Sequence, residues 1–195
     1  MEKTTREILI NAARKLFGQI GITQTTINDI ALESKKGRRT LYTYFKNKNE
    51  LIDAIIEEEL QFIISSLEQV MKLNTDPITK LITYITVRMN TIRTAVKRNG
   101  SLQAEFFMDV IKVELVRRRL EKIEIKNLET ILKEGIEKNV FQNVDIKKSA
   151  IIAHFVMRGL DIPYIRGILT SIEDEKDETL IRIVQGILKV NELEN

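Results

Sequence analysis

Residues 34–48, SKKGRRTLYTYFKNK, bring together the side chains of this sequence that are best suited to bind an anion. Six Lys or Arg residues surround three aromatic residues there, and the segment contains no acid. Ammonium and guanidinium groups bind phosphate oxygens, and a guanidinium can donate two parallel hydrogen bonds to one partner. The segment is therefore either an unusually basic loop in solvent or a surface that meets phosphates.

The distribution of charge along the chain favours the second interpretation. The net charge of the whole chain is only +3. Residues 1–50 contain ten Lys or Arg against five acids, a net charge of +5, which leaves 21 bases and 23 acids for the remainder. A basic head on a nearly neutral body indicates a polyanionic partner for the head alone.

Other kinds of chemistry find little support in the sequence. The chain has no cysteine, which excludes disulfides, thiolate metal sites and cysteine nucleophiles. We find no metal-ligand spacing, no Gly-rich phosphate loop and no nucleophile–base pair. The one histidine, His154, lies in the apolar run AIIAHFVM, where a buried or pocket-lining side chain is expected. We therefore expect no catalytic residues, no bound metal and no cofactor.

The composition is that of an ordinary globular protein. Of the 195 residues, 43% are apolar and 30% are charged, so the chain can bury a sizeable core. The first residues lack the apolar stretch of a signal peptide. No charge-free apolar run approaches the roughly 18 residues that a membrane-spanning helix needs. We expect a soluble, cytoplasmic protein with no membrane partner.

Helical periodicity runs through most of the chain. Ile8, Ala12 and Leu16 share one stripe, and two prolines and eight glycines are too few to interrupt long helices. Thr26 with Asp29, and Asn47 with Glu50, have the spacing of helix N-caps. We expect an all-α fold of about nine helices, near residues 4–21, 26–34, 38–45, 47–73, 77–100, 101–111, 113–139, 144–172 and 174–190.

Residues 40–45, TLYTYF, permit two interpretations of their own. Their alternation and β-branched content are typical of a strand. A lone strand would be unstable, however, and no partner strand lies near it in the sequence. The helical spacing of Leu41, Tyr44 and Phe45 favours a short third helix.

Three short helices followed by a long one are the layout of a helix-turn-helix head. Within that layout, AARKLFGQIGITQTTINDIALES and TLYTYFKNKNEL resemble the N-terminal domain of TetR-family transcriptional regulators. The matching residues are Ala12, Ala13, Leu16, Phe17, Gly21, Thr25, Thr26, Ile30, Ala31, Thr40, Leu41, Tyr42, Tyr44, Phe45, Lys48 and Leu51. The resemblance covers about the first quarter of the chain.

The turn before the third helix departs from the family pattern. Members of the family usually have Ala-Gly-Val-Ser-x-Gly there, and this chain has SKKGRR at residues 34–39. Lys35 occupies the place of the glycine, where a left-handed backbone costs a residue with a Cβ roughly 1–2 kcal/mol. Either Lys35 adopts that conformation or the turn is rebuilt around Gly37.

The resemblance implies that the third helix faces double-stranded DNA. Leu41 and Phe45 would anchor it, Arg38 and Arg39 would read bases, and Lys46 and Lys48 would meet phosphates. Thr25 or Thr26 would meet a phosphate at the second helix. The candidate DNA-binding residues are Thr25, Thr26, Lys36, Gly37, Arg38, Arg39, Thr40, Tyr42, Tyr44, Lys46 and Lys48.

The resemblance also implies a division of labour along the chain. Residues 1–47 would bind DNA, and residues 48–195 would bind an effector and form a homodimer through helices near 146–170 and 175–191. Such a protein would be a repressor on a palindromic operator, released by a small molecule. Candidate residues are Leu180, Ile183, Val184 and Ile187 for the dimer interface, and Tyr84, Met89, Phe106, Phe107, Phe155 and Met157 for the effector pocket.

Two other classes of protein remain as alternatives. A helical adaptor that binds only proteins would show no salt-dependent affinity for DNA. An all-helical enzyme would need a polar constellation, which the sequence does not display.

Overall fold

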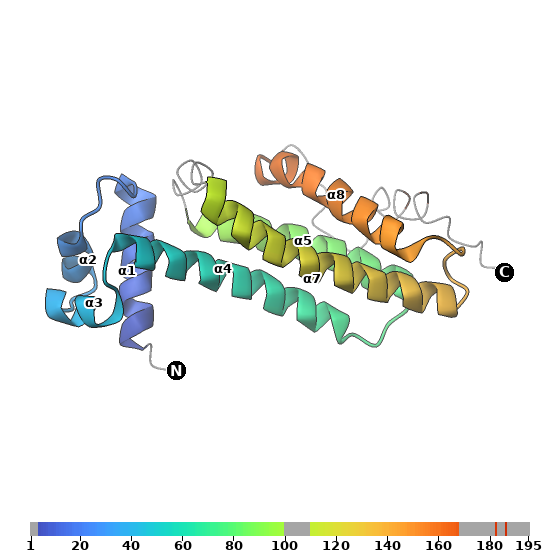
Figure 1. Cartoon of the computed structure of the whole chain (residues 1–195), viewed down its shortest axis with the longest axis horizontal. Helices are drawn as coiled ribbons and strands as arrows, with labels where there is room; N and C mark the ends of the chain where they lie inside the picture. The colour runs from blue at the N-terminus through green and yellow to red at the C-terminus, as the bar shows by residue number, and fades with distance from the viewer. Residues whose placement is uncertain (1–3, 100–109, 168–181, 183–185, 187–195) are drawn as a thin grey trace. The chain divides into compact units, whose positions relative to one another are not determined.

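The computed structural model describes residues 4–99 and 110–167, together with residues 182 and 186. That part of the chain forms seven α-helices, α1–α5, α7 and α8, and contains no β-strand, which confirms the all-α fold (Figure 1). The count is lower than the expected nine. The helices expected near 101–111 and 174–190 lie largely outside the described residues.

The chain divides into two compact units. The long helices α4 (Lys48–Met71) and α5 (Pro77–Arg98) each contribute residues to both units. The first unit comprises Met1–Gln61 and Ala95–Val116, and the second comprises Phe62–Thr94 and Arg117–Asn195. The expected boundary at residues 47 and 48 separates functions rather than compact units, and it stays a prediction.

Helix α1 (Thr5–Ile20) begins and ends at local sequence features. The hydroxyl of Thr4 accepts a hydrogen bond from the amide of Glu7, whose carboxylate accepts one from the amide of Thr4. This reciprocal capping satisfies two amides that the first turn leaves unpaired. At the other end, Gly21 adopts a φ of 88°. Glycine takes that conformation without steric cost, so the helix ends there.

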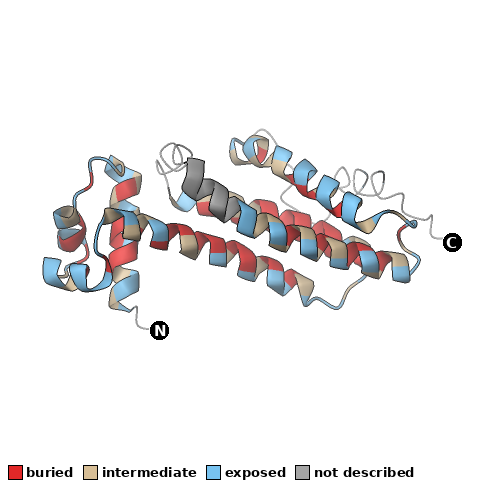
Figure 2. Cartoon of the chain, viewed as in Figure 1, coloured by how far each residue is buried: buried red, intermediate tan, exposed pale blue. Residues whose placement is uncertain are grey.

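Helices α2 (Ile27–Glu33) and α3 (Arg38–Tyr44) pack on α1 around one apolar core. Residues 40–44, for which the sequence allowed a strand or a helix, are thus helical. Phe17, Ile30, Leu41 and Phe45 are buried in this core (Figure 2). The other buried members are Leu9, Ile10, Ala12, Ala13, Ala31, Leu51, Ala54 and Ile55, of which the last three belong to the start of α4.

The turn between α2 and α3 is built on Lys35, which settles the alternative left open by the sequence. Lys35 has a φ of 53°, in the left-handed region, whereas Gly37 has a φ of −66° and serves as the N-cap of α3. The amide of Lys35 donates to the carbonyl of Leu32, and the amide of Lys36 donates to that of Ala31. These bonds close α2 and hold Lys35 in its unfavourable conformation.

The second unit consists mainly of α7 (Val110–Glu137), α8 (Ile146–Ile165) and most of α5. Helix α5 starts at its proline as the sequence predicts, since the carboxylate of Asp76 accepts a hydrogen bond from the amide of Thr79. Tyr84 and Leu128 are fully buried here. No helix among the described residues is both long and apolar enough to cross a membrane.

Replacing Lys35 by glycine should stabilise the protein. Glycine removes a left-handed backbone strain of about 1–2 kcal/mol. It also makes the unfolded chain more flexible, which lowers the stability by about 0.5–1 kcal/mol. We therefore expect Lys35→Gly to raise the free energy of unfolding by about 0.5–1 kcal/mol, measured by thermal or urea denaturation.

Gly37→Ala is the matched control for this substitution. A Cβ on Gly37 would meet its nearest atom, Oγ1 of Thr40, at 3.9 Å, an ordinary contact. Its backbone also suits any residue, so the free energy of unfolding should change by less than about 1 kcal/mol. The turn is assigned wrongly if Gly37→Ala is the more damaging change of the two.

Candidate nucleic-acid interface

Helix α3 presents a polar face to solvent on an apolar anchor. Leu41 is fully buried in the core of the first unit, and Phe45 follows it at the C-cap. Of its other positions, Arg38, Arg39, Tyr42, Thr43 and Tyr44 are exposed and Thr40 is half-buried. The helix is thus held by two buried side chains and leaves most of its other side chains open to solvent.

The basic side chains of this surface are not paired with acids in the described part of the first unit. Arg38, Arg39 and Lys46 are exposed, and Lys36 is half-buried. No ion pair that involves these four side chains occurs among the described residues. Glu33, the acid nearest to them in α2, pairs with Lys15 of α1 at 2.6 Å. The carboxylate of Glu50 also lies at this surface, where it accepts a hydrogen bond from the Lys46 amide at 2.7 Å, but the basic side chains outnumber these acids.

The two threonines before α2 have structural roles that the sequence did not separate. The side chain of Thr25 donates to the carbonyl of Gly21 at 2.7 Å, and the residue is only 1% exposed. Thr26 is the N-cap of α2, and its hydroxyl is bonded to both the amide and the carboxylate of Asp29. Thr25 therefore does not belong to the surface, because its side chain lies in the interior.

Lys48 is engaged by the backbone of the loop between α1 and α2. Its Nζ lies 2.7 Å from the carbonyl oxygen of Ile22, 3.1 Å from that of Thr25 and 3.5 Å from that of Thr23. An ammonium has three hydrogens, and three carbonyls receive them. Lys48 thus anchors the loop in this structure, and the phosphate contact expected of it stays a prediction.

The candidate effector residues do not form one group. Tyr84, Met89 and Met157 are buried in the second unit. Phe155 is half exposed on α8, so its side chain does not join them. Phe106 and Phe107 lie outside the described residues, as do the dimer candidates Leu180, Ile183, Val184 and Ile187.

A buried charge cluster, which the sequence did not predict, joins three helices of the second unit. Arg88 of α5 donates from Nε to Glu124 of α7 at 2.5 Å, and from both terminal nitrogens to Asp161 of α8 at 2.5 and 3.2 Å. Arg88 and Glu124 are essentially inaccessible to solvent. The partners of Arg88 lie 36 and 73 positions after it in the sequence. Helical periodicity alone does not reveal that they meet.

Burial and charge shift the ionisation of this cluster. Burial raises the pKa of Asp161 above its ordinary value, and the hydrogen bonds from Arg88 offset only part of that effect. Burial alone would lower the pKa of Arg88, but the charges of Glu124 and Asp161 outweigh it, so the guanidinium stays charged. Burial, reinforced by Glu124, also raises the pKa of the nearby Tyr84 phenol.

His154 extends the cluster and is buried, in agreement with its sequence context. Its Nδ1 lies 2.8 Å from a carboxylate oxygen of Glu124, and its Nε2 lies 3.9 Å from one of Glu121. The first pair is close but misaligned for a hydrogen bond, so the ring nitrogens and that Glu124 oxygen are unsatisfied. Within the described residues, no group of side chains has the arrangement of a metal site.

Comparison with known proteins identifies the N-terminal fold. Residues 9–55 match the model of the family described as bacterial regulatory proteins, tetR family. The match covers about a quarter of the chain and shows that this N-terminal segment resembles tetR-family regulators. A curated relative, the HTH-type transcriptional regulator YhgD of Bacillus subtilis, is 34% identical to this chain over 67 residues. That match covers 34% of this chain and 35% of YhgD, so it spans only about a third of the relative's length.

Solved structures share the fold over nearly the whole chain. A transcriptional regulator from Cytophaga hutchinsonii has a TM-score of 0.73 at 23% identity, covering 94% of this chain and 97% of that one. The structure of a SmeT–triclosan complex has a TM-score of 0.65 at 18% identity, covering 94% of this chain and 91% of that one. At these identities the similarity establishes the fold alone.

The environment of Lys48 leads to a prediction about stability. Lys48→Met keeps most of the apolar stem and removes the ammonium, which leaves three carbonyls without their charged donor. We expect the free energy of unfolding to fall by about 1–3 kcal/mol, measured by urea denaturation.

Lys46→Met provides the matched control, because Lys46 is exposed. Its unfolding free energy should stay within about 0.5 kcal/mol of the wild type. The anchoring role is refuted if Lys48→Met unfolds like the wild type while the salt dependence of its DNA affinity decreases.

Proposed function

We propose that this chain is a TetR-family transcriptional regulator that binds double-stranded DNA as a dimer. The observation that carries the proposal is the exposed pair Arg38 and Arg39 on the first turn of α3. Their charges are unopposed within the described part of the first unit, and the buried Leu41 fixes the helix that bears them. An adaptor that binds only proteins has no need for this arrangement.

The proposed complex places α3 in the major groove. Arg38 and Arg39 would donate paired hydrogen bonds to guanine O6 and N7, which distinguish guanine from other bases there. Lys36 and Lys46, near the two ends of α3, would contact phosphates and set its register without reading sequence. Tyr42 and Tyr44 are both exposed, and their hydroxyls can donate to the same phosphate backbone.

Dimer formation is supported by an apolar face on α8. Ile151, Ile152, Phe155, Val156 and Ile162 recur on one side of the helix and are 41–59% exposed. A helix face of this kind needs a further surface to cover it. We propose that α8 belongs to the dimer interface, as the sequence predicts for residues 146–170. Two chains would then read two halves of a palindromic operator.

Release by a small molecule is the remaining part of the proposal. The fold is shared with SmeT, whose structure contains triclosan. In this chain the second unit encloses Tyr84, Met89 and Met157 beside the charge cluster of Arg88. We propose that an effector binds among these residues and that the protein represses transcription until it does. A regulator of this kind works in the cytoplasm, and we propose no catalytic activity for it.

Substitutions on α3 should separate base reading from phosphate binding. Arg38→Ala or Arg39→Ala should cost roughly 1–3 kcal/mol on an operator selected from random duplexes, and should relax its sequence preference. Lys46→Ala should weaken the selected and a scrambled duplex alike, and should reduce the slope of log K against log salt by roughly 1 per monomer. Titrations at several salt concentrations measure all of these effects.

Two outcomes would contradict this docking of α3. In one, Lys46→Ala changes the sequence preference while both arginine variants keep it. In the other, the wild-type protein selects no duplex at all, and then the proposed function itself fails. Circular dichroism of each variant checks that its helices are intact.

A charge on the α8 face should break the dimer. Ile152→Glu places a carboxylate in the centre of the exposed apolar face, where dimerisation would bury it without a partner. We expect monomers in light scattering at protein concentrations that keep the wild type dimeric. Leu73→Glu, at a residue that is 44% exposed but lies beyond α4, should remain dimeric. Dimeric Ile152→Glu would exclude this face from the interface.

A further inference from the structure

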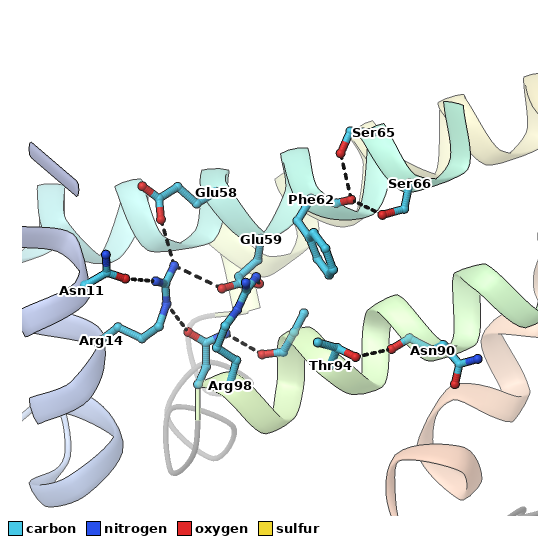
Figure 3. A network of polar contacts seen from close by, with 12 residues as sticks. Asn11, Arg14, Glu58, Glu59, Phe62, Ser65, Ser66, Asn90, Thr94 and Arg98 are labelled. Atoms are coloured by element: carbon cyan, nitrogen blue, oxygen red, sulfur yellow. Dashed lines mark hydrogen bonds and ion pairs between the residues drawn. The ribbon is translucent and has the colours of Figure 1, made fainter. Parts of the chain in front are cut away.

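Arg14 of α1 is the centre of a polar junction that joins three helices of the first unit (Figure 3). Its NH2 lies 2.9 Å from a carboxylate oxygen of Glu58 and 3.2 Å from one of Glu59, both on α4. Its Nε donates to Oδ1 of Asn99, the residue after α5, at 3.3 Å, and its NH1 donates to Asn11 at 2.9 Å. All three guanidinium nitrogens are therefore engaged.

The junction is shielded from water at its centre, whereas the side chains of Glu58 and Arg98 at its edge are 35% and 41% exposed. The side chains of Arg14 and Glu59 are each 11% exposed. Glu59 also pairs with Arg98, at the end of α5, so two guanidinium groups face the carboxylates of Glu58 and Glu59. Partly buried pairs are screened less by salt than surface pairs are. Their geometry is also stricter than that of apolar contacts, because hydrogen bonds weaken steeply when misaligned.

The apolar core described for α1, α2, α3 and the start of α4 contains no residue of α5. The contacts between α1 and the end of α5 include the bond from Arg14 to Asn99 and the approach of Gly18 to the Asn99 carbonyl. The apolar core thus folds the head, whereas the polar junction connects the head to α5.

Helix α5 also carries Arg88, the centre of the charge cluster in the second unit. From Arg88 to Arg98 the helix continues for ten residues, a rise of about 15 Å.

We propose that Arg14 is a positioning residue that ties the DNA-binding head to the end of α5 and thereby sets the angle at which α3 meets its half-site. This inference rests on the proposed function, because it concerns the placement of two heads on one operator. In a dimer, each head must reach a half-site at a fixed distance and rotation. A head with a loosened junction would fit several half-site spacings about equally well.

The test compares operators that differ only in half-site spacing. An operator is first selected from random duplexes with the full-length wild-type protein. Copies are then made with one base pair added or removed between the half-sites, which rotates one half-site by about 35°. The wild type should bind the selected spacing better than either altered one.

Arg14→Gln should reduce this preference for the selected spacing. We expect the ratio of affinities between selected and altered spacing to fall by roughly 5-fold to 150-fold, the usual range of coupling between sites. Arg14→Lys keeps the positive charge but not the forked guanidinium that reaches all partners. Its affinity ratio should therefore lie between those of the wild type and Arg14→Gln. Lys15→Gln, next to Arg14 but paired only with Glu33 of α2, should keep the wild-type ratio.

A purely structural role of Arg14 predicts a different result. It would lower the affinity for every spacing by the same factor, or leave all affinities unchanged, and either outcome overturns the proposal. If Arg14→Gln does not fold, Asn99→Ala decides, because it removes the α5 partner and keeps the pairs with Glu58 and Glu59. A wild type that selects no operator refutes the proposed function instead, so the two failures are distinct.

Discussion

The burial of Leu41 and Phe45 is the constraint on which the head depends. A helix of seven residues such as α3 does not persist alone in water, because its nucleation cost exceeds what so few hydrogen bonds return. It exists here because these two side chains complete an apolar core begun by Phe17 and Ile30. Because these two buried side chains hold α3 in place, its other positions need not be apolar. Its surface can then be basic and aromatic without destabilising the fold.

Features set by near neighbours in the sequence were predicted well. The caps at Thr26 and Asn47 and the start of α5 at Pro77 depend on residues within one helical turn, so spacing alone reveals them. The turn between α2 and α3 was harder, since Lys35 and Gly37 both offered a solution. Propensity favours glycine in a left-handed conformation. The packing of Leu41 decides instead, because it fixes where α3 must begin, and Lys35 accepts the strain.

Features that depend on distant partners were missed or assigned differently. Lys48 looks like a phosphate ligand in sequence, but its ammonium meets carbonyls that lie more than 20 residues earlier. No motif or spacing in the sequence singles out Arg14 or Arg88. The periodicity of apolar residues tells which side of a helix turns inward, but not which charges meet there. Polar partners in a helical protein are set by how helices approach, which one sequence does not encode locally.

The two units hold their charges in opposite ways, and this difference bears on the proposed regulation. Arg38 and Arg39 are solvated in the free protein and form no ion pair within its described part. Their hydrogen bonds to water can therefore be exchanged for hydrogen bonds to a partner. Arg88, Glu124 and Asp161 have already lost their water and depend on one another across three helices. Separating one member of such a group strands a buried charge at a cost of about 3–5 kcal/mol. An effector that enters the second unit must therefore replace the contact it breaks or move the helix that bears the stranded charge. On this view the charge cluster, more than the apolar side chains around it, decides which ligands shift α5.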